Sequence, residues 1–409
     1  MDDRLTDRSA APGRSAYLGA AAAFAVCMVG TTLPTPLYGL YQEQIGFSEL
    51  MVTVVFAVYA FGVIGVLLLV GNVSDTVGRR PVLLCGLVAA GISAACFLAE
   101  QGLPLLFAGR LFSGLSAGLF TGTATAYVLE LARPERRARA GFAATAANMG
   151  GLGCGTLLSG FLAEYAPNPL VLPFVVHLVM LAASFAVVWL LPETVAGARP
   201  LRTARVQRPT LPPEVRGVFV PAGIATFAGF ALLGVFTSVS PAFLAEDLGI
   251  HNHATVGLVV FAAFFASTIG QLLVPRLGTA RAIPLGCAVL IIGLGLLSIS
   301  LATTTLPALV LAALVGGAGQ GMGLRGAVGE VAAAAPADRR GGVLSALFVV
   351  AYFGISIPVI GVGLLAEPLG LADAGLVFAA CMALLAAASA VYLVRRAGTG
   401  DRPPARSGE

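Results

Sequence analysis

The chain alternates between long apolar stretches and short polar links along almost its whole length. Apolar runs of about 20 residues, enough to cross the hydrocarbon core of a bilayer as a helix, recur twelve times. The predicted spans are 16–38, 50–70, 81–99, 104–129, 140–164, 170–191, 218–244, 255–274, 282–301, 307–331, 342–365 and 372–394. This pattern predicts an all-α membrane protein with twelve transmembrane helices.

The links between these stretches alternate in charge. All 24 basic residues are arginine, and all but Arg110 and Arg325 fall in the two tails or in every second link. The intervening links carry no arginine, and acidic residues in or beside them include Glu43, Glu49, Glu100, Glu246, Asp247 and Asp373. Because positive residues stay on the cytoplasmic side, both tails, residues 1–15 and 395–409, are expected in the cytoplasm.

Composition supports the same class. Hydrophobic residues make up 58% of the chain and charged residues 11%, against roughly 45–50% and 25% in soluble domains. The net charge of +4 does not predict a nucleic-acid partner, since the arginines share one membrane face and suit an anionic inner leaflet. The absence of lysine beside abundant alanine and arginine suggests a bacterial chain in the cytoplasmic membrane.

The longest link, residues 192–217, divides the chain into two halves, 16–191 and 218–394. Glu130 and Glu330 end corresponding predicted helices 200 positions apart, and Gly141 and Gly341 open the next helices at the same offset. Two related halves of six helices are a recurring plan of secondary transporters, with the substrate bound near the midplane between them. We therefore expect two pseudo-symmetric six-helix bundles joined by a cytoplasmic linker.

The most specific motif lies in the link 71–81, Gly-Asn-Val-Ser-Asp-Thr-Val-Gly-Arg-Arg-Pro. Gly78 permits a tight turn with positive φ. Arg79 lies four positions after Asp75, within reach of it in a helical turn. Pro81 suits the first turn of the following helix. The motif resembles the loop signature of the major facilitator superfamily, although Thr76 stands where that family usually has a basic residue.

The resemblance implies that this link latches the outward-facing state and breaks when the protein opens inward. The expected latch residues are Gly71, Asp75, Gly78, Arg79, Arg80 and Glu130. For Glu130 two interpretations stay open: it pairs with the arginine cluster that follows it, or it joins the latch at the inner surface. The corresponding link of the second half, residues 275–281, keeps Gly278 but has no aspartate, so the latch is expected to be asymmetric.

Two further stretches are similar to patterns of the same family. Leu106, Arg110 and Gly114 follow its pattern in the fourth helix, and the resemblance implies a role for Arg110 in proton coupling. An arginine at the bilayer centre costs roughly 2.5–3.5 kcal/mol, but Arg110 lies near the start of its span, so snorkelling to the outer surface is the alternative. The span 140–164 keeps the glycines of an exporter pattern but has Thr156 and Ser159 in place of proline and glycine.

The resemblance also implies a substrate cavity lined by four of the predicted helices. Its candidate residues are Thr31, Thr32, Arg110, Tyr127, Phe230, Phe236, Gln320 and Arg325. Arg325 either binds an anionic group there, or pairs with Glu330 or snorkels inward. His177, inside the span 170–191, either titrates near neutral pH or is a hydrogen-bonded packing residue.

The energy source is expected to be an ion gradient. A chain without lysine cannot form the phosphate-binding loop that ATP hydrolysis uses. Gly114 to Gly118 matches the Gly-x-Ser-x-Gly of hydrolases, but that motif needs a strand-turn-helix setting, so no enzyme is expected. We expect no cofactor; a metal site at His251 and His253 is a weaker alternative.

The preferred function is proton-coupled export of a small lipophilic or weakly anionic, drug-like compound by an alternating-access transporter acting as a monomer. Proton-coupled uptake of an organic anion or sugar is the closest alternative. A non-transporting membrane sensor or scaffold is the alternative from another class.

Overall fold

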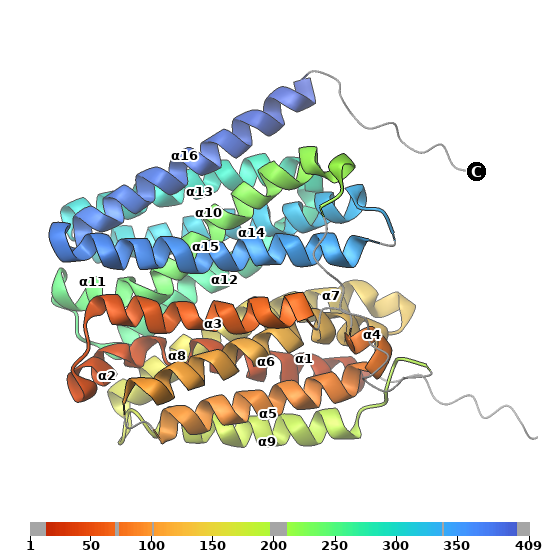
Figure 1. Ribbon diagram of the computed structural model, residues 1–409, viewed down its shortest axis with the longest axis horizontal. Coiled ribbons are helices and arrows are strands. Elements are labelled where there is room, and N and C mark those ends of the chain that lie inside the picture. The colour runs from red at the N-terminus through yellow and green to blue at the C-terminus, as the bar shows by residue number, and fades with distance from the viewer. Residues whose placement is uncertain (1–13, 70–72, 100–101, 197–210, 338, 399–409) are drawn as a thin grey trace, which may run out of the picture. The chain divides into compact units, whose positions relative to one another are not determined.

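A computed structural model describes residues 14–69, 73–99, 102–196, 211–337 and 339–398, which form helices joined by short turns, with no strand among them (Figure 1). Eleven described helices are long and apolar enough to cross a membrane. The helices of the first part are α1 (Arg14–Thr32), α2 (Tyr38–Ile45), α3 (Glu49–Leu69), α4 (Val73–Val77), α5 (Arg79–Leu98), α6 (Leu103–Glu130), α7 (Arg137–Thr145), α8 (Gly151–Tyr165) and α9 (Leu172–Leu190). Those of the second part are α10 (Arg216–Ser238), α11 (Ser240–Glu246), α12 (His253–Leu277), α13 (Thr279–Thr303), α14 (Leu306–Ala334), α15 (Arg340–Leu369) and α16 (Leu371–Gly398).

The predicted span 140–164 is helical but divided. A five-residue π-helical segment, Ala146–Gly150, separates α7 from α8 without a break in the helical path. Neither α7 nor α8 is long enough alone to be counted as a span, so the described residues hold eleven candidate spans where the sequence predicted twelve. Insertions of this kind inside α-helices are frequently found at functional sites.

The first predicted span, 16–38, differs more from the structure. The α-helix stops at Thr32, a short 3-10 turn follows at Thr35–Leu37, and α2 continues to Ile45. Pro34 and Pro36 explain the interruption, because proline has no backbone N–H to donate and its ring clashes with the preceding helical turn. The predicted span 218–244 likewise consists of two helices, α10 and α11, with Pro241 at the start of the second.

The chain forms two compact units. Unit 1 comprises residues 1–45 and 58–208, and unit 2 comprises residues 46–57 and 209–409, so α3 contributes its first residues to unit 2 and the rest to unit 1.

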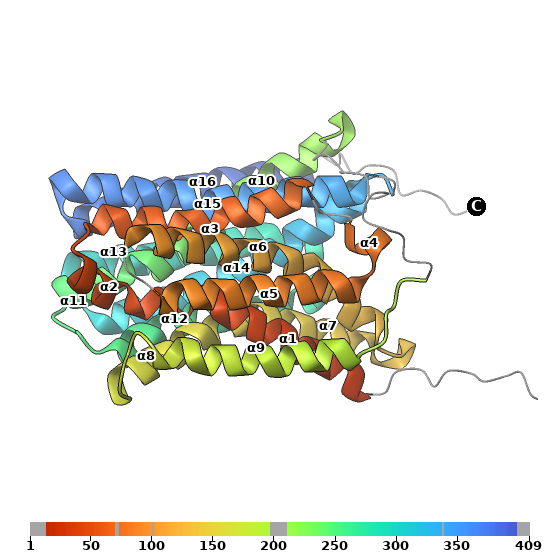
Figure 2. The ribbon, with the colours of Figure 1, turned by 60° about the horizontal axis from the view of Figure 1, so that its bottom comes forward.

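Within unit 1, α6 packs against α1 and α5, α1 also packs against α8 and α9, and α5 packs against α9 (Figure 2). Glycines allow two of its close approaches. A Cβ on Gly114 of α6 would lie 2.0 Å from the carbonyl oxygen of Tyr59, and one on Gly155 of α8 would lie 2.2 Å from that of Val29. Small residues at helix contacts let backbones pack closely in lipid, which accounts for the glycine-rich sequence of these helices.

Unit 2 repeats this pattern of neighbours. Here α14 packs against α10 and α13, α10 packs against α15 and α16, and α13 packs against α16. Gly354 of α15 lies against the backbone of Phe227 in α10, as Gly155 lies against α1 in unit 1. Gly78 and Gly278, at the same offset of 200, precede α5 and α13 with φ of 112° and 81°. The two units therefore share one pattern of internal helix packing.

Candidate functional site

The link between α3 and α5 forms an ion-pair cluster around Arg79. Helix α4 places Asp75 one turn before Arg79, and the Arg79 guanidinium pairs with the Asp75 carboxylate. Its Nη1 also donates to Ser74 Oγ at 2.7 Å. The Asp75 side chain is 53% exposed and that of Arg79 12%. The pairing predicted from the four-residue spacing is present in the structure.

Glu130, at the end of α6, binds the same guanidinium. Arg79 Nη2 donates to Glu130 Oε1 at 3.0 Å, and Arg79 Nε lies 3.3 Å from both carboxylate oxygens. The hydroxyl of Thr194 donates to Glu130 Oε2. Of the two interpretations of Glu130, the structure favours membership of this cluster over pairing with the arginines that follow it.

In unit 2 the equivalent carboxylate has a different partner. Glu330 accepts a hydrogen bond from the hydroxyl of Thr279, the residue that stands 200 positions after Arg79. The second link therefore has a neutral donor where the first has a guanidinium.

Glu193 is one member of the site that sequence reasoning missed. The backbone N–H groups of Arg79 and Arg80 donate to Glu193 Oε1 and Oε2 at 2.9 and 3.0 Å. The first N–H groups of a helix have no partner inside the helix and attract negative charge, so Glu193 caps α5. A Cβ on Gly78 would lie 2.5 Å from Glu193 Oε2. Glycine at position 78 thus allows the positive φ and leaves room for this carboxylate.

The end of α9 is fastened to its neighbours by two more contacts. The Tyr127 hydroxyl of α6, which is buried, donates to the carbonyl of Pro192 at 2.7 Å. The Arg80 guanidinium lies 5.0 Å from the centre of the Trp189 ring, a cation–π distance. Tyr127, assigned to the cavity by sequence, thus lies beside the Arg79 cluster, which we define as Ser74, Asp75, Arg79, Glu130, Glu193 and Thr194. Gly71 lies outside the described residues.

Arg110 is fully buried in α6. Its Nη1 donates to the carbonyl oxygen of Thr31 at 2.6 Å, and its Nε donates to the Tyr38 hydroxyl. The guanidinium lies 5.1 Å from the centre of the Tyr38 ring and 6.0 Å from that of Phe97. The snorkelling interpretation is wrong, because the charge is held inside unit 1, where it bonds α6 to α1 and α2.

The two threonines of the expected cavity are also buried in unit 1. Thr31 donates to the carbonyl of Met28 at 2.7 Å, and Thr32 donates to the carbonyl of Leu152 in α8. Their hydroxyls therefore support the packing of α1.

The candidates from unit 2 lie on α10 and α14. Phe230 packs edge-on against Tyr352, with ring centres 6.0 Å apart, and Phe236 is fully buried. Gln320 Oε1 accepts from Ser267 Oγ at 2.6 Å. Arg325 is partly exposed. Among the described residues, no group of three or more His, Cys, Asp or Glu side chains is placed to hold a metal ion.

Comparison with known proteins identifies the family of the chain. The Major Facilitator Superfamily model matches residues 20–298. Multidrug resistance protein MdtL of Escherichia coli is 25% identical over 269 residues, which are 60% of this chain and 64% of the relative. MdtL of Shewanella oneidensis is 29% identical over 116 residues, 28% of this chain and 29% of the relative. The class D tetracycline resistance protein of Salmonella ordonez is 31% identical over 137 residues, 33% of this chain and 34% of the relative.

These matches span less than two thirds of the length of each relative. The family match covers more than half of the chain, and this family consists of membrane transporters, not enzymes. The glycine-bounded link with its Asp75–Arg79 pair, the repeated helix packing and the family match lead to one conclusion: this multi-pass membrane protein belongs to the major facilitator superfamily.

Proposed function

We propose that the protein exports a small lipophilic or weakly anionic organic compound in exchange for protons, by alternating access in a bacterial cytoplasmic membrane. The names of the relatives, multidrug and tetracycline resistance proteins, support this choice of substrate. In this proposal twelve helices form two related six-helix halves, 192–217 is the linker between them, and the arginine-rich links and both tails face the cytoplasm.

The Arg79 cluster is the observation that carries the proposal. A transporter must hold one state and then release it, and its ligands must bind the two states differently. The Asp75 carboxylate is 53% exposed and that of Glu130 37%, and exposed ion pairs are typically worth less than about 1 kcal/mol each. Several such contacts on one guanidinium order the link together, yet each is weak enough to break. This is the energetic profile of a latch.

Arg110 supports the proton-coupling part. A buried guanidinium remains charged and is expensive to keep in a membrane, so it is expected to have a function. In this structure it bonds two helices of unit 1 through Thr31 and Tyr38. A change of charge near it would alter the packing of α1 on α6. For the substrate, we propose contacts with Phe230, Phe236, Gln320 and Arg325 of unit 2.

The test is proton release in proteoliposomes that contain the full chain and a pH-sensitive dye. Tetracycline, ethidium, benzoate and lactose are added under an imposed proton gradient, with protein-free liposomes as the control. The proposal expects proton movement with tetracycline or ethidium, opposite in direction to the drug.

Proton movement in the same direction as benzoate or lactose would favour uptake over export as the function. Thr156 and Ser159, which depart from the exporter pattern, favour that second candidate. Drug movement without protons would contradict proton coupling.

A further inference from the structure

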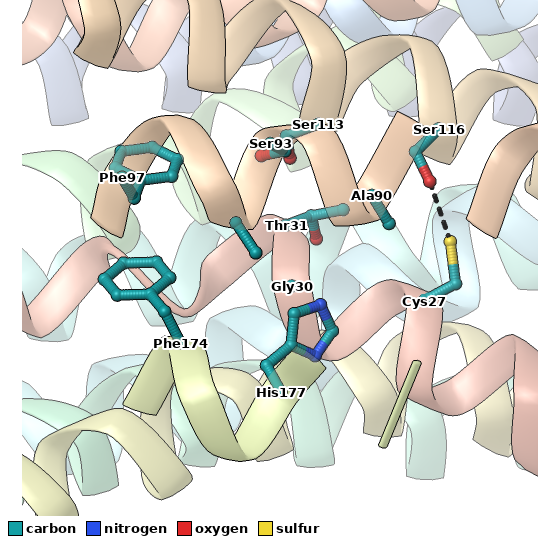
Figure 3. Close-up of a pocket in the computed structure, with 11 residues that line it drawn as sticks. Cys27, Gly30, Thr31, Ala90, Ser93, Phe97, Ser113, Ser116, Phe174 and His177 are labelled. Atoms are coloured by element: carbon teal, nitrogen blue, oxygen red, sulfur yellow. Dashed lines mark hydrogen bonds between the residues drawn. The ribbon is translucent and has the colours of Figure 1, made fainter. Parts of the chain in front are cut away.

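Unit 1 contains a small cavity between α1, α5, α6 and α9 (Figure 3). Its volume is about 10 Å³, close to the minimum that holds one water molecule. Its polar lining consists of Cys27, Thr31, Ser93, Ser113, Ser116 and His177. Polar cavities of this size usually hold water, whereas apolar ones stay dry.

Two polar groups of this cavity have no protein partner. Neither ring nitrogen of His177, which is 1% exposed, makes a hydrogen bond within the described protein, and the same holds for the Ser113 hydroxyl. The other serines are bonded: Ser93 donates to the carbonyl of Gly109, and Ser116 donates to that of Gly86. Because buried polar groups nearly always have a partner, we assign the missing partner of His177 and Ser113 to a water molecule in the cavity.

The chain makes specific room for the imidazole. A Cβ on Gly30 of α1 would lie 2.3 Å from His177 Nε2 and 2.9 Å from its Cε1. The ring of His177 therefore rests against the backbone of α1 at Gly30, one position before Thr31. In Figure 3 the imidazole extends from α9 toward Gly30 and Thr31.

We propose that His177 is a proton-binding site of the transporter, reached through the water of this cavity. The inference rests on the proton coupling proposed above and names the residue that takes up the proton. Histidine is the side chain whose ordinary titration falls between pH 5 and 8. The proton binds the ring nitrogen that is unprotonated in the neutral imidazole.

The other titratable groups around His177 are poorer proton carriers. On α1, the Cys27 thiol faces Ser116 at 3.0 Å, and α5 contributes no titratable side chain to the lining. On α6, the Arg110 guanidinium is bonded to Tyr38, and arginine does not act as a proton donor or acceptor in proteins. Helix α8, which also packs on α9, carries Cys154, Glu164 and Tyr165, and none of these lines the cavity.

Thr31 connects the cavity to Arg110. It lines the cavity, and its carbonyl oxygen accepts from Arg110 Nη1 at 2.6 Å. Phe97, another lining residue, lies with its ring centre 6.0 Å from the Arg110 guanidinium. A protonated His177 would add a second positive charge to this poorly solvated region, where like charges repel strongly. Proton binding would thereby weaken the contact between α1 and α6.

A direct test uses the small number of histidines. The chain has three, His177, His251 and His253. In the variant His251→Gln/His253→Gln, His177 is therefore the sole remaining histidine of this sequence. The full-length variant is labelled with ¹⁵N-histidine in lipid nanodiscs, and the ring-nitrogen shifts are followed from pH 5 to 9. The inference expects one titration within this range. Shifts that stay constant over this range would overturn it and make His177 a packing residue.

A transport measurement distinguishes failure of this inference from failure of the proposed function. Proton release driven by tetracycline is measured in proteoliposomes for wild type, His177→Gln and the control His251→Gln. We expect at least a tenfold loss of proton release in His177→Gln and wild-type release in the control. Unchanged release and an unchanged pH profile in His177→Gln would overturn the inference. Drug transport without protons in wild type would refute the proposed function, while the titration would still decide whether His177 binds a proton.

Discussion

The carboxylate of Glu193 occupies the space into which any side chain at Gly78 would project. A Cβ at Gly78 would lie 2.5 Å from Glu193 Oε2, and Glu193 accepts hydrogen bonds from the next two backbone N–H groups. The end of α9 is thus bound to the first turn of α5, and it brings Thr194 to Glu130. The Arg79 cluster therefore includes the beginning of the segment that follows the sixth predicted span.

Gly78→Ala should destabilise the protein more than Gly278→Ala. Both glycines have positive φ, and strained backbone of this kind costs of order 1–3 kcal/mol for other residues. A Cβ at Gly278 meets nothing within 4 Å, whereas one at Gly78 meets Glu193. Melting temperatures in detergent should fall further for Gly78→Ala. Equal decreases would show that the Glu193 contact adds nothing to the backbone strain.

Glu193→Ala should lower the melting temperature, because α5 loses its N-terminal cap. Such caps are worth about 0.5–2 kcal/mol. Glu193→Gln keeps one oxygen acceptor and should lose less. Glu135→Gln, also in a cytoplasmic link by the sequence topology, serves as the control and should melt like wild type. A Glu193→Ala protein as stable as wild type would contradict the capping role.

Asp75→Asn should reduce the transport rate at least tenfold while leaving the amount of protein in the membrane unchanged. The substitution removes the charge that pairs with Arg79 but changes the size of the side chain little. Rates are measured in proteoliposomes, and quantitative blotting of membranes serves as the control for insertion. A wild-type rate would rule out the latch.

Gly30→Ala should unfold or distort unit 1 around His177, since the added methyl would overlap the imidazole. The double variant Gly30→Ala/His177→Ala removes the ring and should recover most of the lost melting temperature. A double variant that is less stable than Gly30→Ala alone would show that the overlap is not the cause.

Arg325→Ala should raise the KM for an anionic substrate severalfold with little change in maximal rate, because the guanidinium is proposed to bind the substrate's negative group. The measurement is concentration-dependent uptake into proteoliposomes. If only the yield of folded protein falls, Arg325 has a structural role.

The helices were predictable because the signal is local. Hydropathy placed the third helix at 81–99, and α5 runs over Arg79–Leu98. The Asp75–Arg79 pair was predictable for the same reason, since a four-residue spacing fixes proximity in a helical turn. The break after Thr32 was missed because apolar residues continue through Pro34 and Pro36, and hydropathy does not register a lost hydrogen bond.

The partners of the site were not predictable, because they come from distant positions. Glu193 follows Arg79 by 114 residues, and Tyr38 precedes Arg110 by 72. Glu193 left one signal: it is an acidic residue at the end of a span, on the side where the arginines gather. For His177, a lone histidine in an apolar helix could not be distinguished from a packing residue until Gly30 and the cavity were seen.

The most direct test of proton-driven export is accumulation of drug against its own gradient. Proteoliposomes whose lumen is acidified, with the cytoplasmic face of the protein outward, are mixed with radiolabelled tetracycline. Proton-driven export predicts that tetracycline accumulates inside above its external concentration, and that a protonophore abolishes the excess. Equilibration to the same concentration on both sides, at a rate independent of the pH gradient, would contradict it.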